Sequence, residues 1–130
     1  MDNSILTGKY LRQILLENQE LMKLITSDKI FPLIANADTT FPFIVYSRNN
    51  LIPTYTKDGR VSNQLTYDFV IVSDKYIESL DIANAVRHAL ETYRWYDSNI
   101  HIDPIRLDQA YEETLDDAYL QRLQFSLTVS

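Results

Sequence analysis

Residues 64–93 change their hydrophobic period once, from the two of a strand to the three or four of a helix. Over residues 65–72, apolar and polar side chains alternate, and their β-branched and aromatic types favour a strand. Val70 and Val72 make both faces apolar at its end, so the strand is expected to enter the interior. Ser73 or Asp74 is suited to cap a helix over residues 75–93. We expect the apolar stripe of this helix to pack on the sheet: Ile77, Leu80, Ala83, Val86, Ala89 or Leu90, and Tyr93.

A second helical stripe lies near the N-terminus and has a polar gap at Asn18. Its apolar members are Leu11, Ile14, Leu15, Leu21, Met22 and Ile25. Either one helix spans residues 8–26, or Asn18 ends one helix and caps a second, shorter one. The pattern favours the broken version, because Glu20 near the second start suits the helix dipole. The helix is expected to stop at residues 27–28.

Two strands are predicted between this helical region and the central unit. Residues 30–35 are apolar but contain Pro32, which predicts an edge strand or an extended arm. Residues 42–47 predict a strand, after a loop at 36–40. A long polar connection at 49–62 contains an Asp-Gly turn signal, so the flanking strands are expected to form a hairpin with a protruding tip.

The C-terminal third predicts two more strands. Apolar residues over 100–107 indicate a strand with an irregularity at Pro104, and residues 119–129 alternate to the end. Between them, residues 108–117 carry five carboxylates and are expected to form an acidic loop. The predicted fold is α+β, with a mainly antiparallel sheet of about four to five strands packed against two helices. Its order is α-β-β-β-α-β-β.

Length and composition favour one domain over residues 1–130. The chain is 45% hydrophobic, and 130 residues bury enough surface for a core without covalent staples. There is no cysteine, which excludes disulfides and thiolate metal sites. The first residues show no signal-peptide pattern, and no apolar run approaches the length of a membrane span. The net charge of −6 argues against a protein that grips nucleic acid by its phosphates.

No catalytic constellation is found. His88 and His101 fall in different predicted elements, and His88 is expected to be a half-exposed structural residue. The acidic stretch 108–117 is the best metal candidate, but its spacing matches no calcium loop, so a solvated loop is favoured. The nine tyrosines lack the interleaved basic residues of a nucleic-acid platform and are expected in the core or at an interface. No metal or cofactor is predicted.

Five segments in order carry a resemblance to a known family. They are the apolar helix at 15–25, Lys-Ile-Phe-Pro at 29–32, Phe-Pro-Phe-Ile-Val-Tyr at 41–46, the strand–helix unit at 66–90 and the C-terminal strand at 119–127. In order and spacing the chain resembles the tail-completion, or tail-terminator, proteins of long-tailed bacteriophages and prophages. The acidic stretch 108–117 and the long hairpin tip depart from that pattern.

The resemblance implies a structural subunit rather than an enzyme. It implies a ring, usually of six subunits, that closes the head-proximal end of the tail tube and joins tail to head. The implied partners are other copies of the chain, the tail-tube protein and the connector or neck proteins, with DNA passing through unbound and no membrane involved. The protein would act at the head–tail junction of the virion after assembly in the bacterial cytoplasm. The alternatives are a host protein-binding module on the same scaffold and a small metal-dependent hydrolase.

Two long connections of opposite charge are the predicted contact between subunits. A ring requires a head-to-tail interface, in which two different patches meet, and opposite charges would fix its register. The apolar residues of the 49–62 connection would supply affinity. The predicted interface residues are Arg48, Leu51, Ile52, Tyr55, Lys57, Arg60, Glu112, Glu113, Asp116 and Asp117. That both connections are merely solvated stays open as the alternative.

Overall fold

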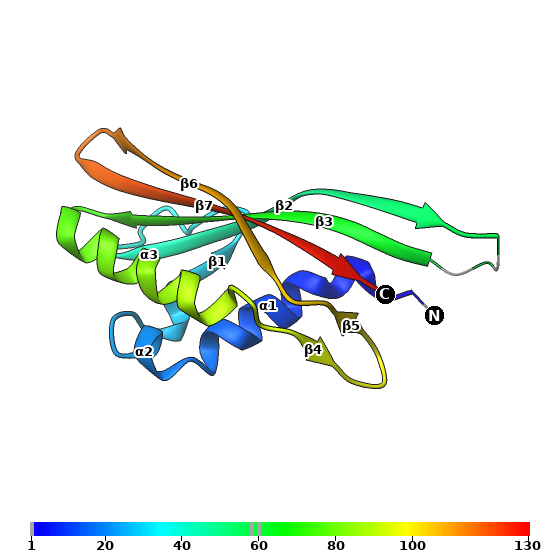
Figure 1. Ribbon diagram of the computed structural model, residues 1–130. Helices are drawn as coiled ribbons and strands as arrows, with labels where there is room; N and C mark the ends of the chain where they lie inside the picture. Colours follow the sequence, from blue (N-terminus) through cyan, green and yellow to red (C-terminus); the bar gives the residue numbers. More distant parts are fainter. Residues whose placement is uncertain (1, 58, 60) are drawn as a thin grey trace.

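The protein is a curled sheet with its helices gathered on one face (Figure 1). The computed structural model describes residues 2–57, 59 and 61–130. The helical elements are η1 (Ser4–Leu6), α1 (Thr7–Leu16), α2 (Gln19–Met22), η2 (Ser27–Lys29) and α3 (Tyr76–Leu90). The strands are β1 (Ile30–Pro32), β2 (Phe43–Tyr55), β3 (Val61–Ser73), β4 (Trp95–Tyr96), β5 (His101–Ile102), β6 (Arg106–Leu115) and β7 (Ala118–Val129).

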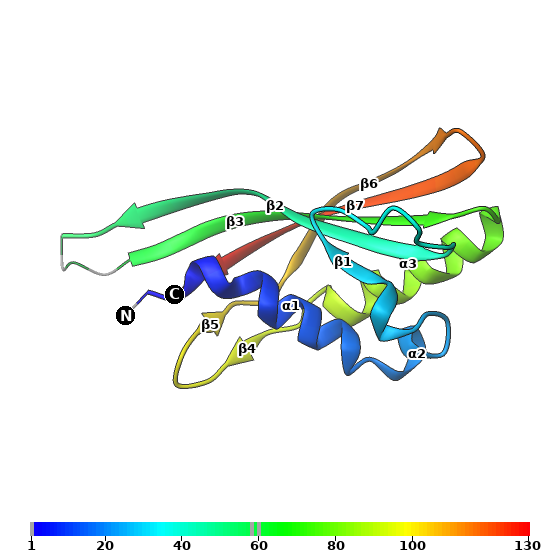
Figure 2. The same cartoon turned by 180° about the vertical axis from the view of Figure 1, so that it is seen from behind.

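The sheet has seven strands, which corrects the prediction of about four to five, and it is mainly antiparallel as predicted, with one parallel pair. Its order is β1-β2-β3-β7-β5-β4, with β6 also paired to β7. The pairs β2–β3, β3–β7 and β6–β7 are antiparallel, but β1 lies parallel to β2 at the edge. The loop over residues 33–42 carries the chain back across the edge, so that β2 runs in the same direction as β1 (Figure 2). Hydrophobic periodicity does not encode the direction of a partner strand, which is why the sequence did not predict this pair.

The predicted strand–helix unit is present, with a shifted helix face. In β3, Leu65, Tyr67, Phe69 and Ile71 are buried beneath the helices. Helix α3 packs on β3 and β7 as expected, but it ends at Leu90, and Ile77 is 65% exposed. The buried stripe instead includes Ser79 and Ile82, together with the predicted Ala83, Val86, Ala89 and Leu90. The cap was also misplaced: Lys75 occupies the N-cap position, while the Ser73 hydroxyl donates to Glu78 at 2.7 Å and accepts from the Lys75 N–H.

The break in the N-terminal helix is confirmed at Asn18. Its side-chain Oδ1 accepts the backbone N–H of Leu21 at 2.9 Å, as the N-cap of α2. The break turns the chain so that both Leu15 and Leu21 are fully buried. The structure therefore has three α-helices where two helical regions were predicted, because the first region is divided at Asn18 as favoured.

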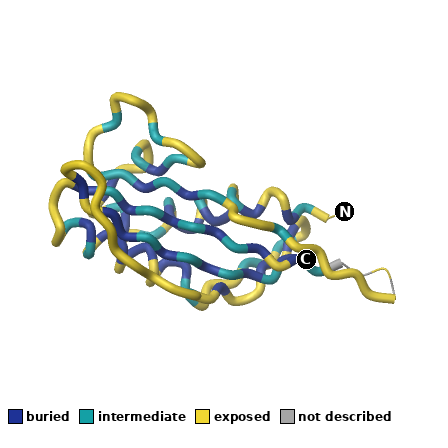
Figure 3. Tube along the Cα trace, turned by 90° about the horizontal axis from the view of Figure 1, so that it is seen from above, coloured by how far each residue is buried: buried dark blue, intermediate teal, exposed yellow. Residues whose placement is uncertain are grey.

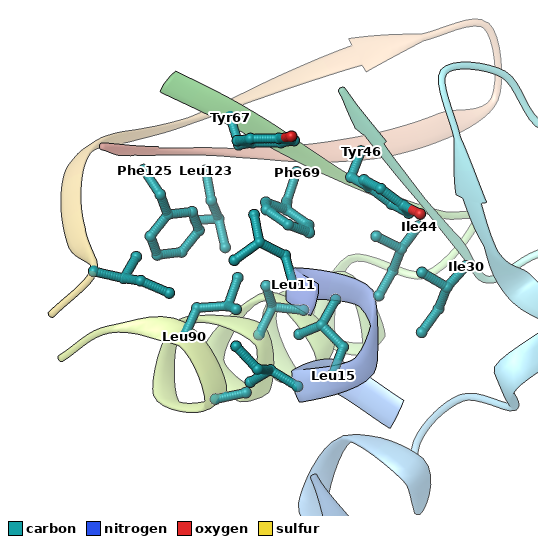
Figure 4. Close-up of a cluster of buried hydrophobic side chains, with 14 of the residues drawn as sticks. Leu11, Leu15, Ile30, Ile44, Tyr46, Tyr67, Phe69, Leu90, Leu123 and Phe125 are labelled. Carbon is teal, nitrogen blue, oxygen red and sulfur yellow. The ribbon is translucent and has the colours of Figure 1, made fainter. Parts of the chain in front are cut away.

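The core lies between the sheet and the helices. Figure 4 shows side chains of α1 and α3 meeting those of the central strands. Phe69 and Phe125 pack edge to face with ring centroids 5.7 Å apart, and Tyr46 stacks on Phe69 at 5.6 Å. The labelled members of this cluster are Leu11, Leu15, Ile30, Ile44, Tyr46, Tyr67, Phe69, Leu90, Leu123 and Phe125.

The predicted 49–62 connection is mostly strand. β2 and β3 continue as a pair to Tyr55 and Val61, and form an arm that projects beyond the helices (Figure 1). A β-bulge between Arg48 and Asn50 adds one residue to β2, so the inward positions change from 44 and 46 to 51, 53 and 55. This shift of phase made the segment look irregular in sequence, although the predicted hairpin with a protruding tip is present.

The acidic stretch 108–117 is also strand rather than loop. Arg106–Leu115 forms β6, which pairs with β7 along its length through a bulge between Leu107 and Gln109. All of its side chains except that of Leu107 are exposed, so the sequence showed no alternation of polarity to identify it. The strand expected at 100–107 is divided: β5 occupies two residues, and β6 begins only after Pro104.

Candidate functional site

The arm formed by β2 and β3 exposes apolar side chains at one end of the sheet. Ile52 is 57% exposed and Tyr55 is 73% exposed, far more than most tyrosines of the chain. Lys57 lies in the turn and is exposed. Arg60, the other cation predicted here, lies outside the described residues. Figure 3 shows the arm as an exposed projection from the otherwise half-buried sheet.

Two residues predicted for the interface lie at the base of the arm, where Arg48 is exposed and Leu51 is partly buried. The guanidinium of Arg48 donates to the carbonyl oxygen of Ile5 at 3.3 Å. It also lies close to the phenolic oxygen of Tyr67, whose pKa is raised by burial and lowered in part by Arg48. Leu51 is partly buried and packs against the core. These contacts join the arm to the start of the chain.

The opposite end of the sheet carries the acidic strand β6. Some carboxylates at this end have hydrogen-bond or ion-pair partners within the subunit, and others do not. Glu112 accepts hydrogen bonds from Gln121 Nε2 at 2.8 Å and from the Tyr76 hydroxyl at 2.7 Å. The bond from Gln121, followed by that from Tyr76, holds the pKa of Glu112 below its usual value. Glu113 forms an ion pair with Arg122 on β7. Both carboxylates are thus held within the subunit.

Asp116 and Asp117 form the turn between β6 and β7 and project from it. Both are exposed, and neither side chain has a hydrogen-bond or ion-pair partner among the described residues. Asp116 has a φ of 54°, a left-handed conformation that Asp tolerates in tight hairpin turns. These two carboxylates are therefore available to a partner.

An apolar groove lies beside this turn, on the sheet face that the helices leave open. Its cavity has a volume of about 460 Å³, in the range of small binding pockets. Phe41 stacks on Phe43 with centroids 5.9 Å apart, and Leu115 on the other wall is 63% exposed. The lining residues are Phe41, Phe43, Val72, Leu115, Asp116, Asp117, Ala118 and Leu120. The sequence analysis did not single out Phe41 and Leu115 as exposed apolar residues, although the Phe-Pro-Phe run at 41–43 was a signal for the first.

The structure does not bring the two predicted patches together within one subunit. The arm and the β6–β7 turn lie at opposite ends of the sheet in both side views (Figures 1 and 2). The cationic arm and the free carboxylates of Asp116 and Asp117 therefore cannot neutralise each other in one chain. Each end is left to contact another molecule.

Side chains of the types used in catalysis or metal binding do not cluster in the described part of the chain. His88 on α3 and His101 on β5 are both exposed and lie in different elements. In the part of the chain that the structure describes, no three His, Asp or Glu side chains gather closely enough to hold a metal ion. None of the described helices combines the length and the apolar character needed to cross a membrane.

Comparison with known proteins identifies the family. Residues 9–129 match the family described as Tail completion protein gp17, and the chain belongs to that family of structural phage tail proteins. A chain from the virion of a native gene transfer agent particle has the same fold, with a TM-score of 0.79 at 15% identity, covering 92% of this chain and 90% of that one. A second solved chain aligns with a TM-score of 0.56 at 10% identity over 95% of each chain. A search of curated protein sequences gives no significant match.

Proposed function

We propose that the protein forms a closed ring of six subunits at the head-proximal end of the tail tube and joins the tail to the head. Membership of the tail-completion family supports a structural role in the tail. The six-fold count follows the resemblance described above and is part of the proposal.

The observation that carries the proposal is the chemical difference between the two ends of the sheet. One end carries an exposed arm with Tyr55 and Lys57, and the other carries an apolar groove beside Asp116 and Asp117. Unlike patches on opposite ends of a subunit suit a head-to-tail interface, and such interfaces close into rings when the rotation between subunits allows it. A two-fold dimer would require one patch to be complementary to itself, which neither end is.

The proposed role is geometric. One face of the ring would cover the tail-tube protein, and the other would present a surface to the connector or neck proteins. DNA would pass through the centre during packaging and ejection. A chain with a net charge of −6 suits such a channel, because clustered cations would retain phosphates. Assembly would take place in the bacterial cytoplasm before the virion is complete.

Deletion of the gene from the phage or prophage that carries it tests this role. The expected result is the accumulation of separate heads and tails, visible by electron microscopy of lysates, with joined particles restored by a plasmid copy of the gene. A deletion strain that yields joined, infectious particles at the wild-type level would overturn the proposal.

A further inference from the structure

We propose that Tyr55 of one subunit inserts into the apolar groove of the next subunit, with Lys57 placed beside Asp116 and Asp117. The inference rests on the proposed ring and names its contact. Of the interface predicted from sequence, it retains the arm tip and the β6–β7 turn and excludes the two glutamates.

The strand register places the groove on the open face of the sheet. Phe43 pairs with Val72, and Val72 pairs with Leu120, so their side chains share one face. Ile44, Ile71 and Gln121, one position along each strand, are buried on the helix-covered face. The groove is therefore reached from the side of the sheet opposite the helices.

The same register places Tyr55 on the other face of the arm. Leu51 pairs with Leu65, whose side chain points toward the helices, and Tyr55 lies four residues further along the same side. The helices do not extend under the tip, so Tyr55 has no cover within its own subunit and is 73% exposed. Without the bulge between Arg48 and Asn50, this side chain would point to the open face instead.

These two orientations fit subunits that overlap like roof tiles. Successive subunits of a ring keep their faces turned the same way, apart from the rotation between neighbours. An arm that crosses onto the next subunit then presents its helix-side face to the open face of that subunit. Tyr55 would face the groove, whereas Ile52, on the other side of the arm, would face away from it.

The charges agree with this placement. Lys57 follows Tyr55 by two residues and is exposed, and Asp116 and Asp117 form one wall of the groove. Glu112 and Glu113 are less suited, because Gln121 and Arg122 already engage them. A buried tyrosine supplies the affinity expected of an interface anchor, and the charge pair supplies orientation.

Association measurements on matched variants test the anchor. Tyr55→Ala is expected to weaken ring assembly on tail tubes by about 30-fold or more, the scale of an interface hot spot. The control is Ile52→Ala, which removes a similarly exposed side chain from the opposite side of the same arm and is expected to assemble like wild type. Both positions are exposed, so thermal melting should show that both variants fold. Equal assembly of Tyr55→Ala and wild type would overturn the anchor.

The charge pair is tested by reversal and by cross-linking. Lys57→Glu should weaken assembly, and Asp116→Lys with Asp117→Lys should restore it, whereas Glu112→Lys with Glu113→Lys should not. Since the chain has no cysteine, Lys57→Cys with Asp117→Cys provides a unique thiol pair for a short bis-maleimide. The expected product is a ladder of linked subunits. A control pair, Lys57→Cys with Lys23→Cys at the exposed residue that follows α2, should remain unlinked.

The cross-linking and assembly results distinguish a failure of the proposed contact from a failure of the proposed ring. Rings that form on tail tubes with an unlinked Lys57→Cys, Asp117→Cys pair would overturn this contact and leave the proposed function standing. If the wild-type protein forms no ring on tail tubes, the proposed function fails and this contact fails with it.

Discussion

The side-chain amide of Asn63 donates a hydrogen bond of 2.7 Å to the hydroxyl of Ser4, 59 residues away in the sequence. The same amide donates to Asp2 Oδ2 at 3.1 Å, and Asn63 is only 1% exposed. Asp2 in turn accepts from the backbone N–H and the hydroxyl of Ser4. The cluster joins the base of the arm to the start of the chain.

Replacing Asn63 with alanine should therefore loosen the arm and destabilise the fold. We expect Asn63→Ala to lower the free energy of unfolding by about 1–3 kcal/mol, because Ser4 loses a buried donor. Urea denaturation measures the change. Asn50→Ala, at an exposed position of the same arm, is the control, with an expected change below about 0.5 kcal/mol. Equal stability of the two variants would show that the cluster does not hold the arm.

The cluster should also give the protein a specific acid sensitivity. The hydrogen bond from the Ser4 hydroxyl, followed by that from its backbone N–H, lowers the pKa of Asp2 from the ordinary value of 3.8. A lowered folded-state pKa contributes stability that is present above 3.8 and is lost as pH falls through the folded value.

Comparison of unfolding free energies for wild type and Asp2→Asn across that range checks the sign. The wild-type advantage should be constant at neutral pH and should shrink as the pH falls below 3.8. An advantage that grows on acidification would contradict the assigned cause.

The buried faces of the central unit are tested by charge insertion. Phe69 on β3 and Val86 on α3 are both 0% exposed. Phe69→Asp or Val86→Asp should prevent folding, since each would bury a carboxylate without a partner. Ile77→Asp is the matched control, because that side chain is 65% exposed and the variant should melt like wild type. Circular dichroism and thermal melting distinguish the outcomes, and a cooperative wild-type transition in either core variant would mean that the buried faces are wrong.

The sequence predicted those elements in which apolar side chains recur with the period of a strand or a helix. The alternation in 65–72 and the polar gap at Asn18 identified β3 and the break between α1 and α2, because one face of each element is buried. Strand β6 was missed because both of its faces are exposed. The continuation of β2 was missed because the bulge after Arg48 shifts the phase by one residue.

The predicted contact surface was found in part for similar reasons. The opposite charges of residues 49–62 and 108–117 can be read directly from the sequence, so the sequence could point to Lys57 and the acidic stretch. It could not show that Glu113 is paired to Arg122, since that pair depends on the β6–β7 register. The sequence offered the Phe-Pro-Phe run at 41–43 as one signal for the groove, but it could not show that this run meets the end of β3 and the β6–β7 turn.

The most direct measurement of the central claim is electron microscopy of isolated tail tubes mixed with the purified protein, together with the mass of the bound assembly. The expected result is a closed ring at one end of each tube, with a mass that is six times the 15.2 kDa of the chain. Binding along the length of the tube, or a protein that stays monomeric in the presence of tubes, would contradict it.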